Sequence, residues 1–280
     1  MPAAPIAGGW VLPYRLDAPD LHLTLEPALS EVSGIAWDGA RLLALQDEAG
    51  ILFALDPATG NTLKKWPIAG LGDFEDVEVA EGKVYMLKSN GILLEVSGLD
   101  TPGQTVREIR TPLSEADDLE GLGYLASERL LLIAAKEPPM EGGLVDKRFR
   151  RVYGYALPEG RLNPQPRYQI GMAEIKAVLT AQASDEKSRA RAAEFDPESK
   201  KSFKPAGVAV HPLHGDVYIV AAAGQLLAVL GADGTLKGAF HLKKSLFPQP
   251  EGICFDPEGR MYISNEAETG GTLLVFSMQP

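Results

Sequence analysis

The segment Asp118-Leu-Glu-Gly-Leu-Gly-Tyr124 decides the fold, because four other segments of the chain align with it without gaps. The other four are Glu31-Val-Ser-Gly-Ile-Ala-Trp37, Asp73-Phe-Glu-Asp-Val-Glu-Val79, Lys204-Pro-Ala-Gly-Val-Ala-Val210 and Gln249-Pro-Glu-Gly-Ile-Cys-Phe255. Their third positions are residues 33, 75, 120, 206 and 251, which are separated by 42, 45, 86 and 45 residues. Repetition at a period of roughly 45 residues is typical of the blades of a β-propeller.

Each segment is followed by a turn and a strand-like run, and then by a second turn and two further short strands. The second runs are Arg41–Leu45, Lys83–Leu87, Arg129–Ala134, Asp216–Val220 and Arg260–Ser264, and the third runs are Ile51–Leu55, Ile92–Val96, Arg151–Ala156, Gln225–Leu230 and Thr272–Phe276. These runs are rich in the aliphatic and aromatic residues that favour strands. Four strands per repeat predict an all-β protein, a five-bladed β-propeller in which residues 1–280 form one domain.

The ends of the chain and the longest gap complete this prediction. The last repeat stops after its third strand, whereas Leu21–Leu25 precede the first repeat and have no blade of their own. We therefore expect this N-terminal strand to close the last blade, which leaves no open sheet edge.

The 86-residue gap contains an alanine-rich and charged stretch at 171–201, which predicts an inserted helix. Such a helix is either a solvated surface insertion or a lid over the channel. Its apolar residues near helical spacing are Met172, Ile175, Val178 and Leu179.

Composition restricts the partners. The net charge of −11 disfavours nucleic acid and anionic membrane surfaces, so we expect a cation, a small molecule or a protein as the partner. No apolar run is long enough to predict a membrane-spanning helix. The first ten residues lack a secretory signal, which predicts a cytoplasmic protein, or a periplasmic or exported one if the chain has been trimmed. The oligomeric state cannot be read from these features.

The third repeat position predicts a functional site. The innermost strands of a propeller run along its central channel, so equivalent positions form a ring. This ring reads Ser33, Glu75, Glu120, Ala206 and Glu251. Three carboxylates facing one another repel, and a bound cation removes that repulsion. Oxygen donors suit a hard ion, so we expect Ca²⁺ bound by Glu75, Glu120 and Glu251, with Mg²⁺ as the second candidate. The alternative is that these glutamates point into solvent.

Polar side chains in the neighbouring turns should open on the same face of the propeller. They are expected to contact a ligand or to orient the ring residues, and they comprise Ser33, Asp47, Asp73, Asp118, Lys136, Glu137, Asn265 and Glu266. As turn residues they could equally be ordinary solvated groups, because turns are polar in general.

Two classes of function compete. A binding module would present the upper channel face to a small molecule or a protein. A metal-dependent hydrolase of the lactonase or phosphoesterase kind would use the ion to polarise a substrate oxygen, with Lys136, Glu137 and Glu266 as the chemical groups. Carboxylate pairs across a channel could also cleave glycosides. The sequence contains no nucleophile elbow, P-loop or zinc motif, so it assigns no catalytic residue and leaves the question of enzymatic activity open.

The order of these motifs resembles that of a known family. Asp73–Val79, Asp118–Tyr124, the Lys136-Glu137 turn, and Gln249–Ile253 with Asn265-Glu266 are similar to the bacterial SdiA-regulated, YjiK-like propeller proteins, and the resemblance covers residues 20–278. It implies five blades distantly similar to NHL-repeat propellers, no established activity, and calcium-site positions at Glu75, Glu120 and Glu251.

Blade four departs from the pattern of that family. Ala206 stands where the family tends to have a small polar residue, and Lys204 precedes it. A lysine near the mouth would compete with a bound cation.

Overall fold

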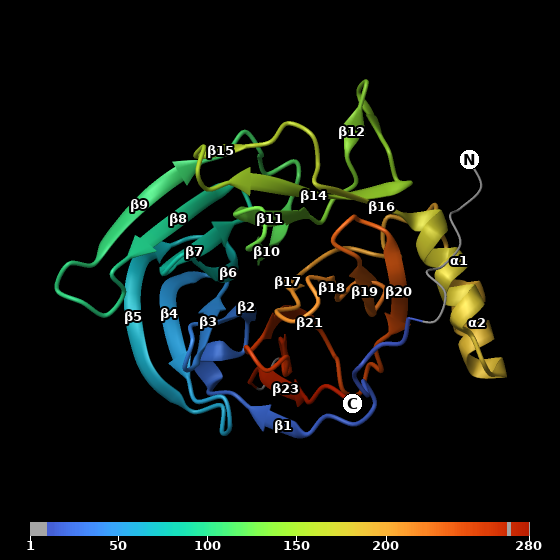
Figure 1. Ribbon diagram of the computed structural model, residues 1–280, viewed down its shortest axis with the longest axis horizontal. Coiled ribbons are helices and arrows are strands. Elements are labelled where there is room, and N and C mark those ends of the chain that lie inside the picture. The colour runs from blue at the N-terminus through green and yellow to red at the C-terminus, as the bar shows by residue number, and fades with distance from the viewer. Residues whose placement is uncertain (1–9, 268–269, 280) are drawn as a thin grey trace.

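The computed structural model describes residues 10–267 and 270–279, and its strands form the predicted five-bladed β-propeller (Figure 1). Each blade is an antiparallel sheet whose first strand lies nearest the central channel. Blade one consists of β2 (Val32–Trp37), β3 (Leu42–Gln46), β4 (Ala49–Leu55) and β5 (Thr62–Leu71). Blade two consists of β6 (Phe74–Ala80), β7 (Lys83–Lys88), β8 (Ile92–Ser97) and β9 (Thr105–Arg110).

The later blades follow the same order with additions. Blade three consists of β10 (Leu119–Leu125), β11 (Leu130–Ala135) and β14 (Phe149–Ala156), and two short strands, β15 (Arg161–Leu162) and β16 (Tyr168–Gly171), both pair with β14. Blade four consists of β17 (Val208–Val210), β18 (Val217–Ala221), β19 (Leu226–Leu230) and β20 (Leu236–His241). Blade five consists of β21 (Pro250–Phe255), β22 (Met261–Asn265), β23 (Thr272–Phe276) and the N-terminal β1 (Leu21–Thr24).

The N-terminal strand closes the ring as predicted. Leu21 of β1 pairs with Val275 of β23, and the antiparallel register continues to Thr24 opposite Thr272. A short 3₁₀ helix (Pro27–Leu29) then leads into blade one. The first and last parts of the chain therefore meet in blade five, which protects the outer edge of that sheet.

The long gap between repeats three and four contains two helices, where the sequence predicted one. They are α1 (Met172–Gln182) and α2 (Glu186–Glu194), and the four apolar residues at helical spacing in α1 are buried. Both helices lie on the outer rim beside β20, away from the channel, which agrees with a surface insertion and not with a lid (Figure 1). A small hairpin of β12 (Met140–Glu141) and β13 (Leu144–Val145) lies between β11 and β14. Within the residues described, no helix is both long and apolar enough to cross a bilayer.

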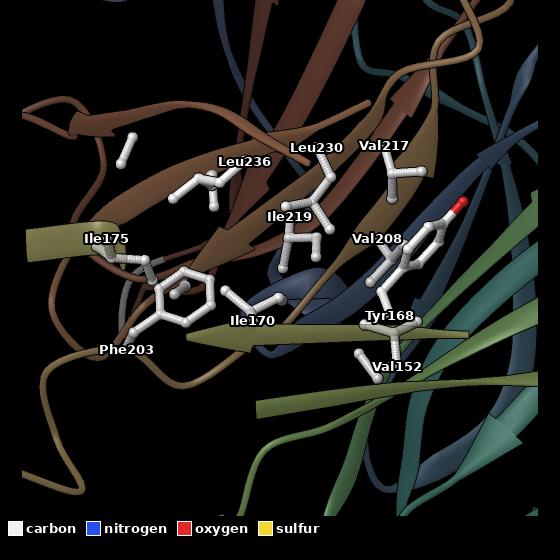
Figure 2. Close-up of a cluster of buried hydrophobic side chains, with 14 of the residues drawn as sticks. Val152, Tyr168, Ile170, Ile175, Phe203, Val208, Val217, Ile219, Leu230 and Leu236 are labelled. Atoms are coloured by element: carbon white, nitrogen blue, oxygen red, sulfur yellow. The ribbon is translucent and has the colours of Figure 1, made fainter. Parts of the chain in front are cut away.

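The hydrophobic core is divided among the interfaces between neighbouring blades. One cluster of buried apolar side chains fills each of the five interfaces. The cluster between blades three and four is the one drawn in Figure 2, where Val152 and Tyr168 face Val217, and Ile175 of α1 lies beside Phe203. The insertion is therefore attached to the core by its apolar face.

The inner strands approach one another most closely at the fourth repeat position. This position is glycine in four blades, and each glycine abuts the inner strand of the next blade. A Cβ atom at Gly121 would lie 2.7 Å from the carbonyl oxygen of Ala206, and one at Gly252 would lie 2.8 Å from the amide nitrogen of Ile35. Gly34 and Gly207 are confined in the same way by the backbones of blades two and five. A side chain larger than hydrogen has no room at these four positions.

Blade two has Asp76 at this position, and its side chain links the ring by hydrogen bonds. Its carboxylate accepts one hydrogen bond from its neighbour Val77 N at 2.8 Å and another from Leu122 N of blade three at 2.7 Å. Asp76 is only 1% exposed, and burial raises the pKa of its carboxyl well above the ordinary value despite these two donors. The carboxyl thus fills the space where the other blades bring two backbones together.

The tight ring predicts the effect of a single methyl group. Gly207→Ala should lower the free energy of unfolding by about 1–3 kcal/mol, because its Cβ would collide with the backbone at Glu251 and lie 3.0 Å from Ile253 N. Gly70→Ala in β5 is the matched control, since a Cβ there meets nothing within 4 Å. Urea unfolding of both variants measures the difference. Equal stability of the two variants would contradict the close approach.

Candidate channel-mouth site

Three glutamates predicted from the repeat reach one cavity because of β-bulges in the inner strands. The pairing register shifts between Phe74 and Asp76 in blade two, between Leu119 and Gly121 in blade three, and between Pro250 and Ile253 in blade five. A bulge places one extra residue out of the pairing and redirects its side chain. The residues inside these bulges include Glu75, Glu120 and Glu251, and Ser33 occupies the equivalent bulge in blade one.

The cavity at this mouth has a volume of about 310 Å³ and is strongly acidic. Its lining residues are Glu31, Ser33, Asp47, Asp73, Glu75, Asp118, Glu120, Lys136, Gln249, Glu251 and Glu266. Six of the eight residues predicted to surround the metal ligands line this cavity, together with the three ring glutamates. They come from several blades, so the closure of the ring brings them together. Glu31 and Gln249, which occupy the first repeat position as Asp73 and Asp118 do, complete the lining.

Burial and mutual repulsion disfavour the charged form of the three ring glutamates. Burial is the largest cause of the raised pKa of Glu75, followed by the charges of Glu120 and Asp73. Burial also raises the pKa of Glu120, although Lys136 opposes the shift. For Glu251, burial and then the Glu120 charge raise the pKa to about 8. The mouth therefore concentrates negative charge that its own protein environment solvates poorly.

Lys136 supplies the positive charge nearest to this ring. It follows directly after β11, and its ammonium group donates a hydrogen bond to Glu120 Oε1. Burial would lower the pKa of Lys136, but the carboxylates of Glu120, Asp118 and Glu251 hold it above the ordinary value. One ammonium cannot neutralise three carboxylates. The mouth consequently keeps an excess of acidic groups.

The outer acidic residues are fixed by their own local contacts. Ser89 donates a hydrogen bond to Asp73, Gln46 Nε2 donates to Asp47 Oδ1 at 2.8 Å, and Gln249 donates to Glu266. Burial raises the pKa of Asp47 and of Glu266. These side chains extend the acidic surface outward from the ring.

Asp118 shows that the backbone at the mouth is constrained. Its φ angle is +50°, in the left-handed region that non-glycine residues rarely adopt. The carbonyl oxygen of Asp118 accepts a hydrogen bond from the backbone nitrogen of Lys136 at 2.7 Å. This bond fixes the start of β10 against the end of β11, which are the two segments that carry the Glu120 and Lys136 pair.

Two predicted site residues do not line the cavity. Glu137 points toward blade four, where it accepts a hydrogen bond from Lys204 and lies 3.7 Å from Lys200 Nζ. Asn265 is fully buried at the end of β22, and among the described residues its amide has no hydrogen-bond partner. Their sequence positions are right for the mouth, but the direction of a side chain after a strand depends on packing that the repeat does not encode.

A second cavity opens beside the first, over blade four. It has a volume of about 400 Å³ and shares Lys136, Gln249 and Glu251 with the acidic cavity. The remaining lining is small or basic and consists of Lys204, Ala206, Ala222, Ala223, Gln225, Lys244 and Pro248. The departure of blade four from the repeat therefore replaces an acidic wall by alanines and lysines. The channel mouth therefore has an acidic side at the ring glutamates and a basic side over blade four.

The arrangement is not already that of a metal-binding triad. Across residues 10–267 and 270–279, no three His, Cys, Asp or Glu side chains converge closely enough to hold an ion. The ring glutamates share a cavity, but Lys136 stands against Glu120 within it.

Comparisons with known proteins agree with this fold. Glutaminyl cyclase from Myxococcus xanthus is similar with a TM-score of 0.61 and 12% sequence identity, over 94% of this chain and 97% of that chain. The PQQ-bound aldose sugar dehydrogenase of Streptomyces coelicolor has a TM-score of 0.49 and 12% identity, over 94% and 100%. At such identity the likeness to the cyclase shows the propeller fold alone. A search of curated protein sequences finds no match.

A family model, in contrast, matches the sequence directly. The SdiA-regulated family matches residues 9–141, a range that contains the inner strands of blades one to three. Glu75, Glu120 and Lys136 all lie within the match. The matched range comprises 133 of the 280 residues, and over this range the chain is similar to the SdiA-regulated family.

Proposed function

We propose that the protein is a ligand-binding propeller module whose site is the channel mouth, and that this mouth binds a cation, with Ca²⁺ as the expected ion. One observation supports this most directly: three poorly solvated carboxyls from three blades face one cavity, and Lys136 is the one cationic side chain among the described residues that line it. A divalent ion would remove repulsion that a single ammonium leaves in place.

The oxygen donors at the mouth suit the ion in chemistry. Ca²⁺ takes roughly six to eight oxygen ligands, and carboxylates, carbonyls and water all serve. Glu75, Glu120 and Glu251 would be the protein ligands, as the sequence predicts. Because Lys136 donates to Glu120, the ion has to compete with its ammonium group. Binding should therefore involve release of Lys136 toward the second cavity, which it also lines.

The second cavity indicates where the rest of a ligand would lie. Lys204 and Lys244 border it, and alanines at 206, 222 and 223 leave space above blade four. A small molecule or a protein segment with an anionic group could place that group between these lysines and a cation at the ring. The upper channel face would then bind a cation at the ring and an anionic group over blade four.

Binding is favoured over metal-dependent hydrolysis by the contacts of the side chains predicted for chemistry. Glu137 is held by Lys204, and Glu266 accepts a hydrogen bond from Gln249. A general base must be free to reach the proton that it removes. Neither carboxylate is presented in that way, so hydrolysis would require Glu137 and Glu266 to leave their present partners.

Thermal unfolding of chelator-treated protein tests the cation proposal. Added Ca²⁺ should raise the midpoint temperature in a concentration-dependent way. At a free Ca²⁺ concentration a hundredfold above Kd, the expected gain in the free energy of unfolding is about 2.7 kcal/mol. Glu75→Gln, Glu120→Gln and Glu251→Gln should each abolish the rise, whereas Glu159→Gln, at an exposed turn of blade three, should keep it. No shift with millimolar Ca²⁺ or Mg²⁺ would refute the proposal.

The position of Lys136 predicts an opposite pair of effects. Lys136→Met should destabilise the chelated protein by roughly 1–3 kcal/mol, because Glu120 loses its charged donor. The same variant should bind Ca²⁺ about tenfold more tightly, since no ammonium competes. Titration calorimetry measures the affinity.

Lys237→Met is the matched control for that experiment. Lys237 pairs with the buried Asp216 at 2.5 Å, and neither residue lines the mouth. It should lower stability while leaving Ca²⁺ affinity unchanged. If Lys136→Met also leaves the affinity unchanged, Lys136 does not compete with the ion.

The raised pKa values predict a pH dependence of stability in chelator. A carboxyl whose pKa is higher in the folded than in the unfolded protein keeps a proton that the unfolded chain has lost, so stability falls as pH rises through the folded pKa. Between pH 7 and 9 the unfolding free energy should fall by up to about 1.4 kcal/mol per pH unit for each extra proton. Denaturant midpoints should show a shallower fall in Glu251→Gln, whose pKa is about 8 in the parent. An unchanged slope in that variant would contradict the assignment.

A further inference from the structure

A further cavity lies away from the channel, at the rim of blade four. It has a volume of about 530 Å³, within the usual range for small-molecule sites. Three segments enclose it: residues 11–17 of the N-terminal stretch, the inserted helices α1 and α2, and the end of the outer strand β20. Figure 1 shows the two helices beside β20 on this rim. The insertion thus supplies one wall of this cavity.

One side of this cavity is apolar. Leu12 and Leu16 come from the N-terminal stretch, Leu179 from α1 and Phe240 from β20. Leu12, Leu16 and Phe240 are only partly buried, although they pack against the core cluster between blades four and five. Apolar side chains that stay partly open beside a cavity favour a ligand with an apolar body.

The other side is positively charged in a protein whose net charge is −11. Its cationic residues are Arg15, Lys187, Arg191 and Lys243, and its acidic residues are Asp17 and Asp185. The two carboxylates are already engaged. Asp185 accepts hydrogen bonds from Ser188 N and Ser188 Oγ at the start of α2, and Asp17 lies 4.0 Å from Arg15.

Three cations therefore remain available at the cavity. Among the described residues, no carboxylate lies within ion-pair distance of Lys187, Arg191 or Lys243. The guanidinium of Arg191 makes one long hydrogen bond, at 3.4 Å, to the carbonyl oxygen of Leu242. A guanidinium with unused donors is well suited to bind a carboxylate through two parallel hydrogen bonds.

His241 supplies a polar group aimed at the same place. It is the last residue of β20 and lines the cavity, and both of its ring nitrogens are shielded from solvent without a hydrogen-bond partner among the described residues. Burial, and then the nearby charge of Arg191, lower the pKa of His241 to about 4, so the ring is neutral and retains one N–H donor. Buried polar groups in native proteins are normally satisfied, which indicates a ligand oxygen here.

We propose that this rim cavity binds a small amphiphilic carboxylate, such as a medium-chain fatty acid. The carboxylate group contacts Arg191 and His241, and the apolar chain lies against Leu179, Leu12 and Phe240. A single carboxylate fits one guanidinium and one neutral imidazole better than a doubly charged phosphate does. The site is separate from the channel mouth and does not depend on a cation there.

Titration calorimetry of the full chain with octanoate tests the proposal. Octanoate should bind, and 1-octanol, which has the same chain without the charge, should bind at least about tenfold more weakly. Arg191→Gln should weaken octanoate binding by about tenfold or more and leave octanol binding unchanged. Lys201→Gln, at an exposed position of the same insertion that does not line the cavity, is the control and should bind octanoate like the parent.

Further variants and competitors keep the test decisive. His241→Phe preserves an aromatic ring of similar shape without the N–H donor, so it should also weaken octanoate binding even if Arg191→Gln folds poorly. Inorganic phosphate should not displace octanoate. Equal binding of octanoate and octanol, displacement by phosphate, or absence of octanoate binding would each overturn the proposal. Because none of these variants lies at the mouth, Ca²⁺ stabilisation should be the same in all of them.

Discussion

The close approach of the five inner strands at the fourth repeat position is the constraint on which the rest of the structure depends. Four blades meet this constraint with glycine, and each glycine contacts the backbone of the next blade. In blade two, Asp76 meets it by bonding to Leu122 N of blade three. A closed ring of this kind fixes the direction of every inner strand, and therefore fixes where the preceding residue points.

The position before this constriction is where function can be added to the ring. In blades one, two, three and five the inner strand is bulged there, so the third-position side chain leaves the pairing and faces the mouth. Acidic residues at Glu75, Glu120 and Glu251 then share one cavity with Lys136. Folding of the ring therefore buries carboxyl groups whose charged form is disfavoured there, because burial raises the pKa of each ring glutamate. Such a conflict between stability and local charge is typical of functional sites.

The sequence predicts the ring well and the directions of individual side chains less well. The repeat predicts the blades, the closing strand and the acidic position, because hydrophobic alternation and glycine placement are local and periodic. It does not predict that Glu137 turns toward Lys204, or that Asn265 is buried away from the cavity. The direction of Glu137 depends on its contact with Lys204 of blade four, a partner distant in sequence. The pairing of Lys136 with Glu120 was not predicted either, although both residues were assigned to the mouth.

Blade four concentrates the features that distinguish this chain from a regular propeller. Its inner strand is only three residues long, and Ala206 stands where three other blades carry glutamate, so the mouth becomes basic and open on that side. Its outer strand is covered by α1 and α2, which create the cavity at Arg191 and His241. The glycine contact at Gly207 nevertheless joins blade four to blade five, as in the regular blades. A blade whose position is fixed by backbone contact at the channel is free to vary at both of its edges, and this freedom explains how one repeat can carry two chemically different cavities.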